Sequence, residues 1–153
     1  MEQRCKKIVQ KLKESNKTIA FMESCTGGFL ANEITNISGA SEVLKVSVVT
    51  YSDEYKIKLG VNKKTIEDYT VYSQETAIEM AKKISEFANS DIGVGITGEL
   101  GNTINKEPKV YYSIYLKETN RLINQTMEVT EKNRKDLKEE IARSVFDDII
   151  KSI

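Results

Sequence analysis

The chain has 153 residues, with 23 Lys and Arg against 23 Asp and Glu, so its formal net charge is zero. This length suits one domain over residues 1–153, and the charge balance gives no reason to expect binding to nucleic acid or to an anionic membrane. The sequence contains no histidine, which excludes Ser-His-Asp and Cys-His catalysis and leaves Lys, Asp, Glu or Tyr as the general base.

The first half of the chain is expected to alternate helices and strands. The predicted elements are an amphipathic helix over 2–15, a β-prone strand over 17–22, a helix over about 27–37 and a strand over 45–51. Two strands joined by a helix imply a parallel crossover. A short helical turn is expected over 52–60, and the polar segment that follows, to Tyr72, carries no predicted element.

The second half begins with the clearest helix, which Ser73 should cap and which should end near Asn89. Residues 91–97 alternate large apolar residues with glycine, which is typical of a strand that lets another element come close. Two strands over 110–116 and 122–129 are joined by so few residues that they should be antiparallel neighbours. Thr130 should cap a closing helix with the buried stripe Leu137, Ile141, Val145 and Ile149.

These elements predict an α/β fold, a three-layer α/β/α sandwich around a mixed sheet. The strands before the two glycine turns, 24–28 and 97–101, should be parallel, so both turns should open at the same carboxyl edge of the sheet. Open α/β sheets bind their ligands at that edge. The glycines of the first turn, Gly27 and Gly28, would let a ligand approach, and we expect the first free N–H groups of the following helix to face it.

Within this edge, Ser24 is the candidate nucleophile and Lys56 the candidate base. A serine without histidine needs another base, and a lysine can serve if burial lowers its pKa from about 10.4 to about 7 or 8. The competing interpretations are that Ser24 is only a helix N-cap and that Lys56 is only a structural lysine. Tyr51 could carry a proton between them, or be a half-buried strand aromatic.

The neighbouring residues allow a structural interpretation as well. Cys25 is better explained as a small buried hydrophobe than as a nucleophile, because no imidazole can pair with it. Glu23 would be a hydrogen-bonded or solvated carboxylate, or a residue that orients the site. With only Cys5 and Cys25, the chain has no disulfide framework, and its basic start is not followed by the apolar run of a signal peptide, so we expect a cytoplasmic protein. We expect no metal, no cofactor and no membrane span.

Several motifs resemble, in chain order, those of the CinA C-terminal-domain family, which includes stand-alone nicotinamide mononucleotide deamidases. They are Glu23-Ser24-Cys25-Thr26-Gly27-Gly28, Gly39-Ala40-Ser41, Thr50-Tyr51-Ser52-Asp53-Glu54-Tyr55-Lys56, Leu59-Gly60-Val61, Ser73, Ile96-Thr97-Gly98 with Gly101, and Asn133-Arg134. The resemblance covers nearly the whole chain. It implies an α/β/α fold and hydrolysis of the nicotinamide mononucleotide carboxamide to nicotinate mononucleotide and ammonia.

Carried over by position, the resemblance implies that Ser24 is the nucleophile, Lys56 the base and Tyr51 its helper, without a metal. Family members commonly form dimers, so a homo-oligomer is expected. The residues expected to bind the substrate or hold its oxyanion are Thr26, Gly27, Gly28, Thr97, Gly98 and, for the phosphate, Arg134.

The chain also departs from the family pattern. Gly98-Glu99-Leu100-Gly101-Asn102 stands where the family commonly has Gly-Ile-Ala-Gly-Pro, which adds a carboxylate near a site for an anionic nucleotide. Val110 follows Pro108-Lys109 where the family commonly has Pro-Val-Gly. Two alternatives therefore stay open: a non-catalytic nucleotide-binding or assembly module on the same scaffold, and an amidase for another small amide.

Overall fold

A mixed five-stranded sheet forms the centre of the molecule. The computed structural model describes residues 1–101, 107–130 and 133–153. Its strands are β1 (Ile19–Glu23), β2 (Leu44–Val49), β3 (Ile92–Gly98), β4 (Lys109–Leu116) and β5 (Arg121–Glu128), in the order β2-β1-β3-β4-β5. β1 is parallel to β2 and to β3, whereas β4 is antiparallel to β3 and to β5. The predicted parallel crossover and antiparallel pair are both confirmed.

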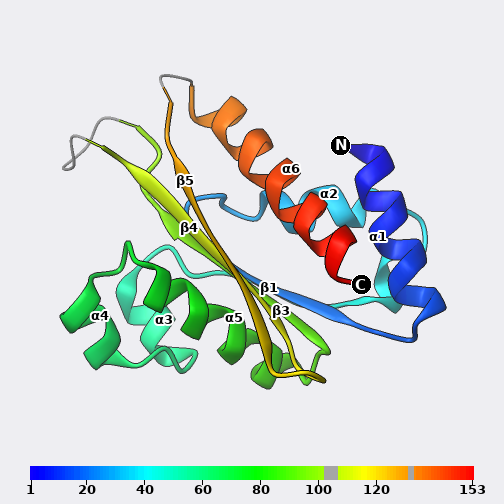
Figure 1. Ribbon diagram of the computed structural model, residues 1–153, viewed down its shortest axis with the longest axis horizontal. Coiled ribbons are helices and arrows are strands. Elements are labelled where there is room, and N and C mark those ends of the chain that lie inside the picture. Colours follow the sequence, from blue (N-terminus) through cyan, green and yellow to red (C-terminus); the bar gives the residue numbers. More distant parts are fainter. Residues whose placement is uncertain (102–106, 131–132) are drawn as a thin grey trace.

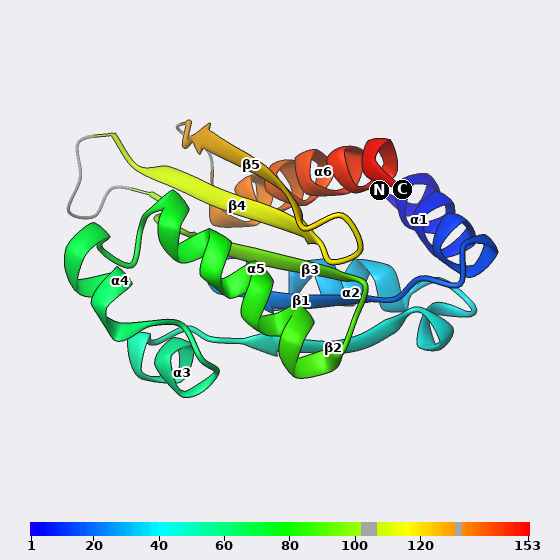
Figure 2. The same cartoon turned by 60° about the horizontal axis from the view of Figure 1, so that its bottom comes forward.

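Helices cover both faces of this sheet. They are α1 (Glu2–Glu14), α2 (Phe29–Thr35), α3 (Asp53–Lys58), α4 (Lys63–Tyr69), α5 (Gln74–Ala88) and α6 (Arg134–Ser152), with a short 3-10 helix at Ala40–Glu42. Figures 1 and 2 show α1, α2 and α6 on one face of the sheet and α3, α4 and α5 on the other. The expected three-layer α/β/α sandwich is therefore confirmed.

The larger part of the core lies under α1, α2 and α6. The predicted stripe of α6, which comprises Leu137, Ile141, Val145 and Ile149, is buried there, as are the apolar residues of α1. Burying such side chains stabilises the fold by about 1.5–3 kcal/mol each, so these stripes hold both helices to the sheet. Among the described residues, no helix combines the length and the apolar character that crossing a membrane requires.

α5 packs on the other face, unusually close to β3, because that strand has glycines where the helix crosses it. A Cβ on Gly93 would lie 2.0 Å from the carbonyl oxygen of Ala81, and a Cβ on Gly95 would lie 2.4 Å from that of Ala77. Only glycine fits at these two positions of β3. The alternation of apolar residues with glycine thus marked a real close approach, as predicted.

Three details differ from the sequence predictions. The segment before Tyr72 contains α4, whose N-cap Asn62 accepts a hydrogen bond from the Lys64 amide and which buries no residue. α6 is capped by Asn133, which accepts from the Asp136 amide, and not by Thr130. β2 ends at Val49, so Tyr51 lies beyond the strand.

Candidate functional site

Ser24 and Lys56 meet at the carboxyl edge of the sheet. Ser24 directly follows β1, and Lys56 lies on α3, which follows the neighbouring parallel strand β2. The Nζ of Lys56 lies 3.2 Å from the Oγ of Ser24. Both side chains are buried, Lys56 with only 1% of its surface exposed. Because parallel strands end at the same edge, residues 32 positions apart in sequence become direct neighbours.

The surroundings of Lys56 favour its uncharged form. Burial lowers the pKa of Lys56, and the nearby Asp53 carboxylate opposes this effect. The Nζ also donates a hydrogen bond to the carbonyl oxygen of Thr50 at 2.7 Å, which fixes its position. A lowered pKa means that the amine is uncharged, and able to accept a proton, at a lower pH than an ordinary lysine, so the geometry and the pKa of Lys56 agree in direction.

Cys25 is 4% exposed, and burial raises the pKa of its thiol to about 12. A thiol with such a pKa stays protonated at neutral pH and is a poor nucleophile. Of the two residues, Ser24 is the better candidate nucleophile, because its hydroxyl contacts the candidate base.

Glu23 organises the glycine turn. Its fully buried carboxylate accepts hydrogen bonds from the Thr26 hydroxyl at 2.7 Å and from the amides of Gly28, Leu30 and Ala31 at 3.0 to 3.2 Å. The positive φ angles of Gly27 and Gly28, 64° and 92°, turn the chain so that these donors converge. The expectation that free N–H groups at the start of α2 face a ligand is wrong for these three amides, because Glu23 occupies them.

The hydroxyl of Tyr51 is not a bridge between Ser24 and Lys56. It accepts a hydrogen bond from the Arg134 guanidinium at 3.3 Å, and the Tyr51 side chain is 66% exposed. Within the described parts of the chain, no hydrogen bond joins this hydroxyl to Ser24 or to Lys56. The reason is that β2 ends two residues before Tyr51, which leaves the tyrosine at the rim of the site.

Ser24 and Lys56 open into a hollow of about 430 Å³, a size that suits a small ligand. It is lined by Ser24, Cys25, Tyr51, Asp53, Lys56, Val71, Tyr72, Gly98, Glu99, Leu100 and Arg134. Arg134, at the start of α6, also donates to the carbonyl oxygen of Leu100 at 2.7 Å, so its guanidinium is held at the rim. Five of the predicted site residues thus surround one hollow.

The other four predicted residues do not line it. Thr26 and Thr97 are buried, and their hydroxyls donate to Glu23 and to the carbonyl oxygen of Val71. Gly27 and Gly28 form the turn behind Ser24. Of the positions that depart from the family pattern, Glu99 lines the hollow, Val110 is buried in β4, and Asn102 lies outside the described residues. Glu99 was expected near the site, whereas sequence reasoning did not assign the lining residues Asp53, Val71, Tyr72 and Leu100 to it.

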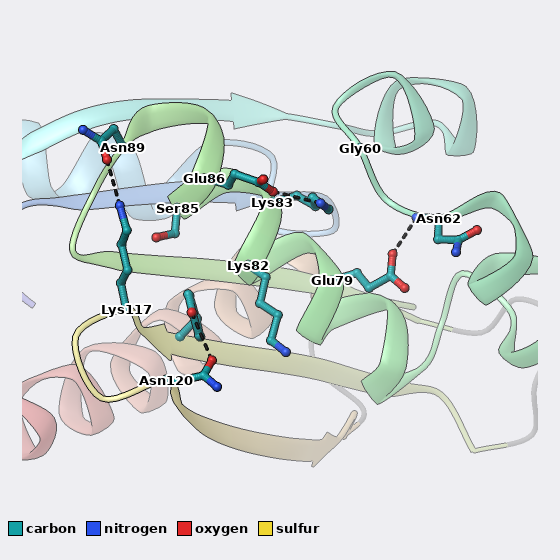
Figure 3. Close-up of a pocket in the computed structure, with 11 residues that line it drawn as sticks. Gly60, Asn62, Glu79, Lys82, Lys83, Ser85, Glu86, Asn89, Lys117 and Asn120 are labelled. Carbon is teal, nitrogen blue, oxygen red and sulfur yellow. Dashed lines mark hydrogen bonds and ion pairs between the residues drawn. The ribbon is translucent and has the colours of Figure 1, made fainter.

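A second hollow, of about 870 Å³, lies over α5 and the β4–β5 turn (Figure 3). Several of its charged groups are engaged within the fold, Lys83 with Glu86 and Lys117 with Asn89 (Figure 3). The amine of Lys82 lies 5.9 Å from the centre of the Tyr115 ring. Glu79 accepts from the Asn62 amide at the α4 N-terminus (Figure 3). These pairs are those of a solvated surface, and the smaller hollow with the buried serine and lysine is the better candidate site. In the described residues, no group of three or more Cys, Asp or Glu side chains is placed to hold a metal.

The family of the chain follows from comparison with known proteins. The family model for the CinA C-terminal domain matches residues 1–153. The chain belongs to the CinA C-terminal-domain family. This CinA C-terminal domain is 50% identical over 104 residues to a protein of Thermoanaerobacter pseudethanolicus whose name calls it competence-damage inducible. The match covers 67% of this chain and 25% of that protein, so the chain spans about a quarter of the length of such relatives.

Solved structures of the family share the fold of this CinA C-terminal domain. A competence or damage-inducible protein from Enterobacter asburiae superposes with a TM-score of 0.90 at 26% identity, over 99% of this chain and 96% of that one. A CinA superfamily protein from Escherichia coli gives a TM-score of 0.92 at 24% identity, over 99% and 90%. The architecture around Ser24 and Lys56 is therefore that of the CinA family.

Proposed function

We propose that the chain is a metal-independent amidohydrolase that converts nicotinamide mononucleotide to nicotinate mononucleotide and ammonia. The observation that carries the proposal is the 3.2 Å contact between the Ser24 hydroxyl and a buried lysine amine whose pKa is lowered. The resemblance of the sequence motifs to nicotinamide mononucleotide deamidases supplies the substrate. The absence of histidine makes the Ser/Lys pair the simplest source of an activated nucleophile.

In the first step the uncharged amine of Lys56 accepts the proton of the Ser24 hydroxyl while Oγ attacks the carboxamide carbon. The hydrogen bond from Nζ to the Thr50 carbonyl uses one N–H, and Nζ donates another to Oγ in the structure, so for this step the uncharged amine turns its lone pair toward Oγ. The resulting ammonium then gives its proton to the departing amide nitrogen. The carbon–nitrogen bond breaks, ammonia leaves, and an ester of Ser24 remains.

The oxyanion of the tetrahedral intermediate needs N–H donors that the fold does not already use. In the parts of the chain that the structure describes, no backbone carbonyl takes the amide N–H of Cys25 or of Thr26, the two residues after the nucleophile; the Cys25 amide faces only its own thiol. We assign the oxyanion to these amides, since the next ones in α2 bind Glu23. Each such donor is worth on the order of 3 kcal/mol in the transition state.

The second half of the reaction reverses the first. Water replaces the leaving amine, Lys56 takes one of its protons, and the hydroxide oxygen attacks the ester carbon. Collapse of this intermediate returns a proton from Lys56 to Ser24 and releases the carboxylic acid, which loses its proton to water and becomes the carboxylate product. The Arg134 guanidinium, held at the rim of the hollow, is the group we assign to the substrate phosphate.

The test is ammonia release from nicotinamide mononucleotide by the purified chain. Ser24→Ala and Lys56→Met should each lower kcat about 1,000-fold or more, because neither variant has an activated nucleophile. Lys58→Met, on the exposed side of the same helix, and Ser41→Ala, on the surface, are matched controls that should keep full activity. The absence of turnover by the wild type would refute the proposal, and turnover of other amides alone would reassign the substrate.

A further inference from the structure

The segment between α4 and α5, which forms one wall of the hollow, has a strained backbone. Thr70 has φ 71° and ψ 166°, a conformation that glycine adopts readily and that is costly for a residue with a branched Cβ. Such a residue persists only where its surroundings hold it. The next two residues, Val71 and Tyr72, line the hollow.

Buried hydroxyl groups hold this segment in place. The Thr76 hydroxyl donates a hydrogen bond to the carbonyl oxygen of Thr70 at 2.9 Å, and the Thr97 hydroxyl donates to that of Val71 at 2.8 Å. Both donors are fully buried, one in α5 and the other in β3. The backbone that leads into Tyr72 is therefore fixed to the helix and to the sheet at once, and these contacts offset the strain at Thr70.

Tyr72 brings an aromatic ring to the hollow. Its side chain is 39% exposed, so the protein does not cover the whole ring. Burial raises the pKa of the Tyr72 phenol, and the charges of two other lining residues, Glu99 and Asp53, raise it further. The phenol thus lies within reach of the groups that line the hollow. Tyr51, from the segment after β2, is a second aromatic residue of the same lining.

Two tyrosines that line one small space suit a planar ring. Aromatic rings pack against one another in offset or edge-to-face arrangements, and such pairs are stabilised beyond the area that they bury. The substrate of the proposed reaction carries its carboxamide on an aromatic ring. A wall whose backbone is fixed before the ligand arrives loses little freedom on binding. The strain at Thr70 then has a functional reason, since this conformation leads the chain into the position of Tyr72.

Resting on the proposed deamidase function, we propose that Tyr72 determines specificity by packing against the aromatic ring that bears the carboxamide, and that Thr70 is the residue that positions it. The substrate class is then a carboxamide on a planar aromatic ring. An aliphatic carboxamide on the same phosphorylated sugar is disfavoured.

The test measures binding without chemistry, by calorimetry in a Ser24→Ala background. Tyr72→Leu, which keeps an apolar side chain but removes the ring, should weaken the binding of nicotinamide mononucleotide about fivefold. Tyr72→Phe, which keeps the ring, should bind within about twofold of the parent protein. Tyr69→Leu changes an exposed tyrosine of α4 that does not line the hollow. It is the matched control and should leave the affinity unchanged.

Thr70→Gly tests the positioning role through two measurements. The midpoint of urea denaturation should rise, because glycine adopts this conformation without strain, whereas the affinity for nicotinamide mononucleotide should fall about threefold, because a freer backbone no longer fixes Tyr72. Asn16→Gly, at another residue with positive φ, follows α1 and is the control, which should leave the affinity unchanged. A lower midpoint, or a higher one with unchanged affinity, would overturn the role of Thr70.

An unchanged affinity of Tyr72→Leu, an equal loss in Tyr72→Phe, or no binding of nicotinamide mononucleotide by the Ser24→Ala protein would each overturn the role of Tyr72. Failure of the proposed function looks different. In that case the wild type releases no ammonia, whatever the affinities of the Ser24→Ala proteins. A loss of affinity confined to Tyr72→Leu would then still support recognition of the aromatic ring.

Discussion

The Nζ of Lys56 is held between the Ser24 hydroxyl at 3.2 Å and the Thr50 carbonyl oxygen at 2.7 Å. The Thr50 contact positions the amine, and the Ser24 contact brings it within hydrogen-bond distance of the hydroxyl whose proton we propose that it accepts. The amine is buried, so its charged form is disfavoured. In the proposed mechanism, the reactivity of Ser24 therefore depends on the protonation of one lysine.

The first prediction concerns the pH dependence of the reaction. Burial lowers the pKa of Lys56, and only its uncharged form accepts the Ser24 proton, so kcat/KM should rise with pH and level off above that pKa. The midpoint should lie below the ordinary lysine value of about 10.4. Steady-state rates of ammonia release across pH would measure it. A rate that is flat or falls as pH rises toward 9 would contradict Lys56 as the base.

The second prediction concerns Glu23. Glu23→Ala removes the acceptor of three amides and one hydroxyl, and leaves these buried or partly buried donors unpaired. The free energy of unfolding should fall by about 3 kcal/mol or more. Urea denaturation followed by circular dichroism would measure the loss.

Glu14→Ala changes an exposed residue at the end of α1. It is the control and should lower the free energy of unfolding by less than about 0.5 kcal/mol. Comparable effects of the two substitutions would show that Glu23 does not hold the turn.

Much of this fold was readable from the sequence because its signals are periodic. The apolar stripes of α1, α5 and α6 and the glycine alternation of β3 each predicted the face that is buried. The proximity of Ser24 and Lys56 followed from topology, because parallel strands bring the residues after them to one edge. These predictions needed only two kinds of rule: the periodicity of side chains along a helix or strand, and the way parallel strands are connected.

What the sequence did not reveal depends on contacts without a periodic signal. α4 buries no residue, so its stripe is too weak to detect, and only Asn62 marks its start. The contact of Glu23 with Ala31 spans eight residues through two glycines with positive φ, which no helix or strand period describes. The rim position of Tyr51 results from where β2 ends, and boundaries are the least certain part of a sequence prediction.

The start of α6 gives the third prediction, which compares two candidate caps. Asn133 accepts a hydrogen bond from the Asp136 amide, so Asn133→Ala should lower the free energy of unfolding by about 1 kcal/mol. Thr130→Ala should leave it unchanged within about 0.5 kcal/mol, because Thr130 lies before the cap. Chemical denaturation of both variants measures the difference. The reverse order of the two effects would mean that the helix begins earlier in solution.

The fourth prediction tests the role of the Tyr51 hydroxyl, whose hydrogen bond goes to Arg134 and not to the Ser/Lys pair. If this hydroxyl only steadies the guanidinium that we assign to the phosphate, Tyr51→Phe should raise KM for nicotinamide mononucleotide a few-fold and leave kcat within about threefold. Arg134→Met should raise KM by about tenfold or more, because the substrate phosphate would lose its charged partner.

Tyr55→Phe changes an exposed tyrosine on α3. It is the control for Tyr51→Phe and should change neither kcat nor KM. A fall in kcat of about 100-fold for Tyr51→Phe, with KM unchanged, would show that the hydroxyl joins the proton transfer once the substrate is bound, as the bridging hypothesis requires.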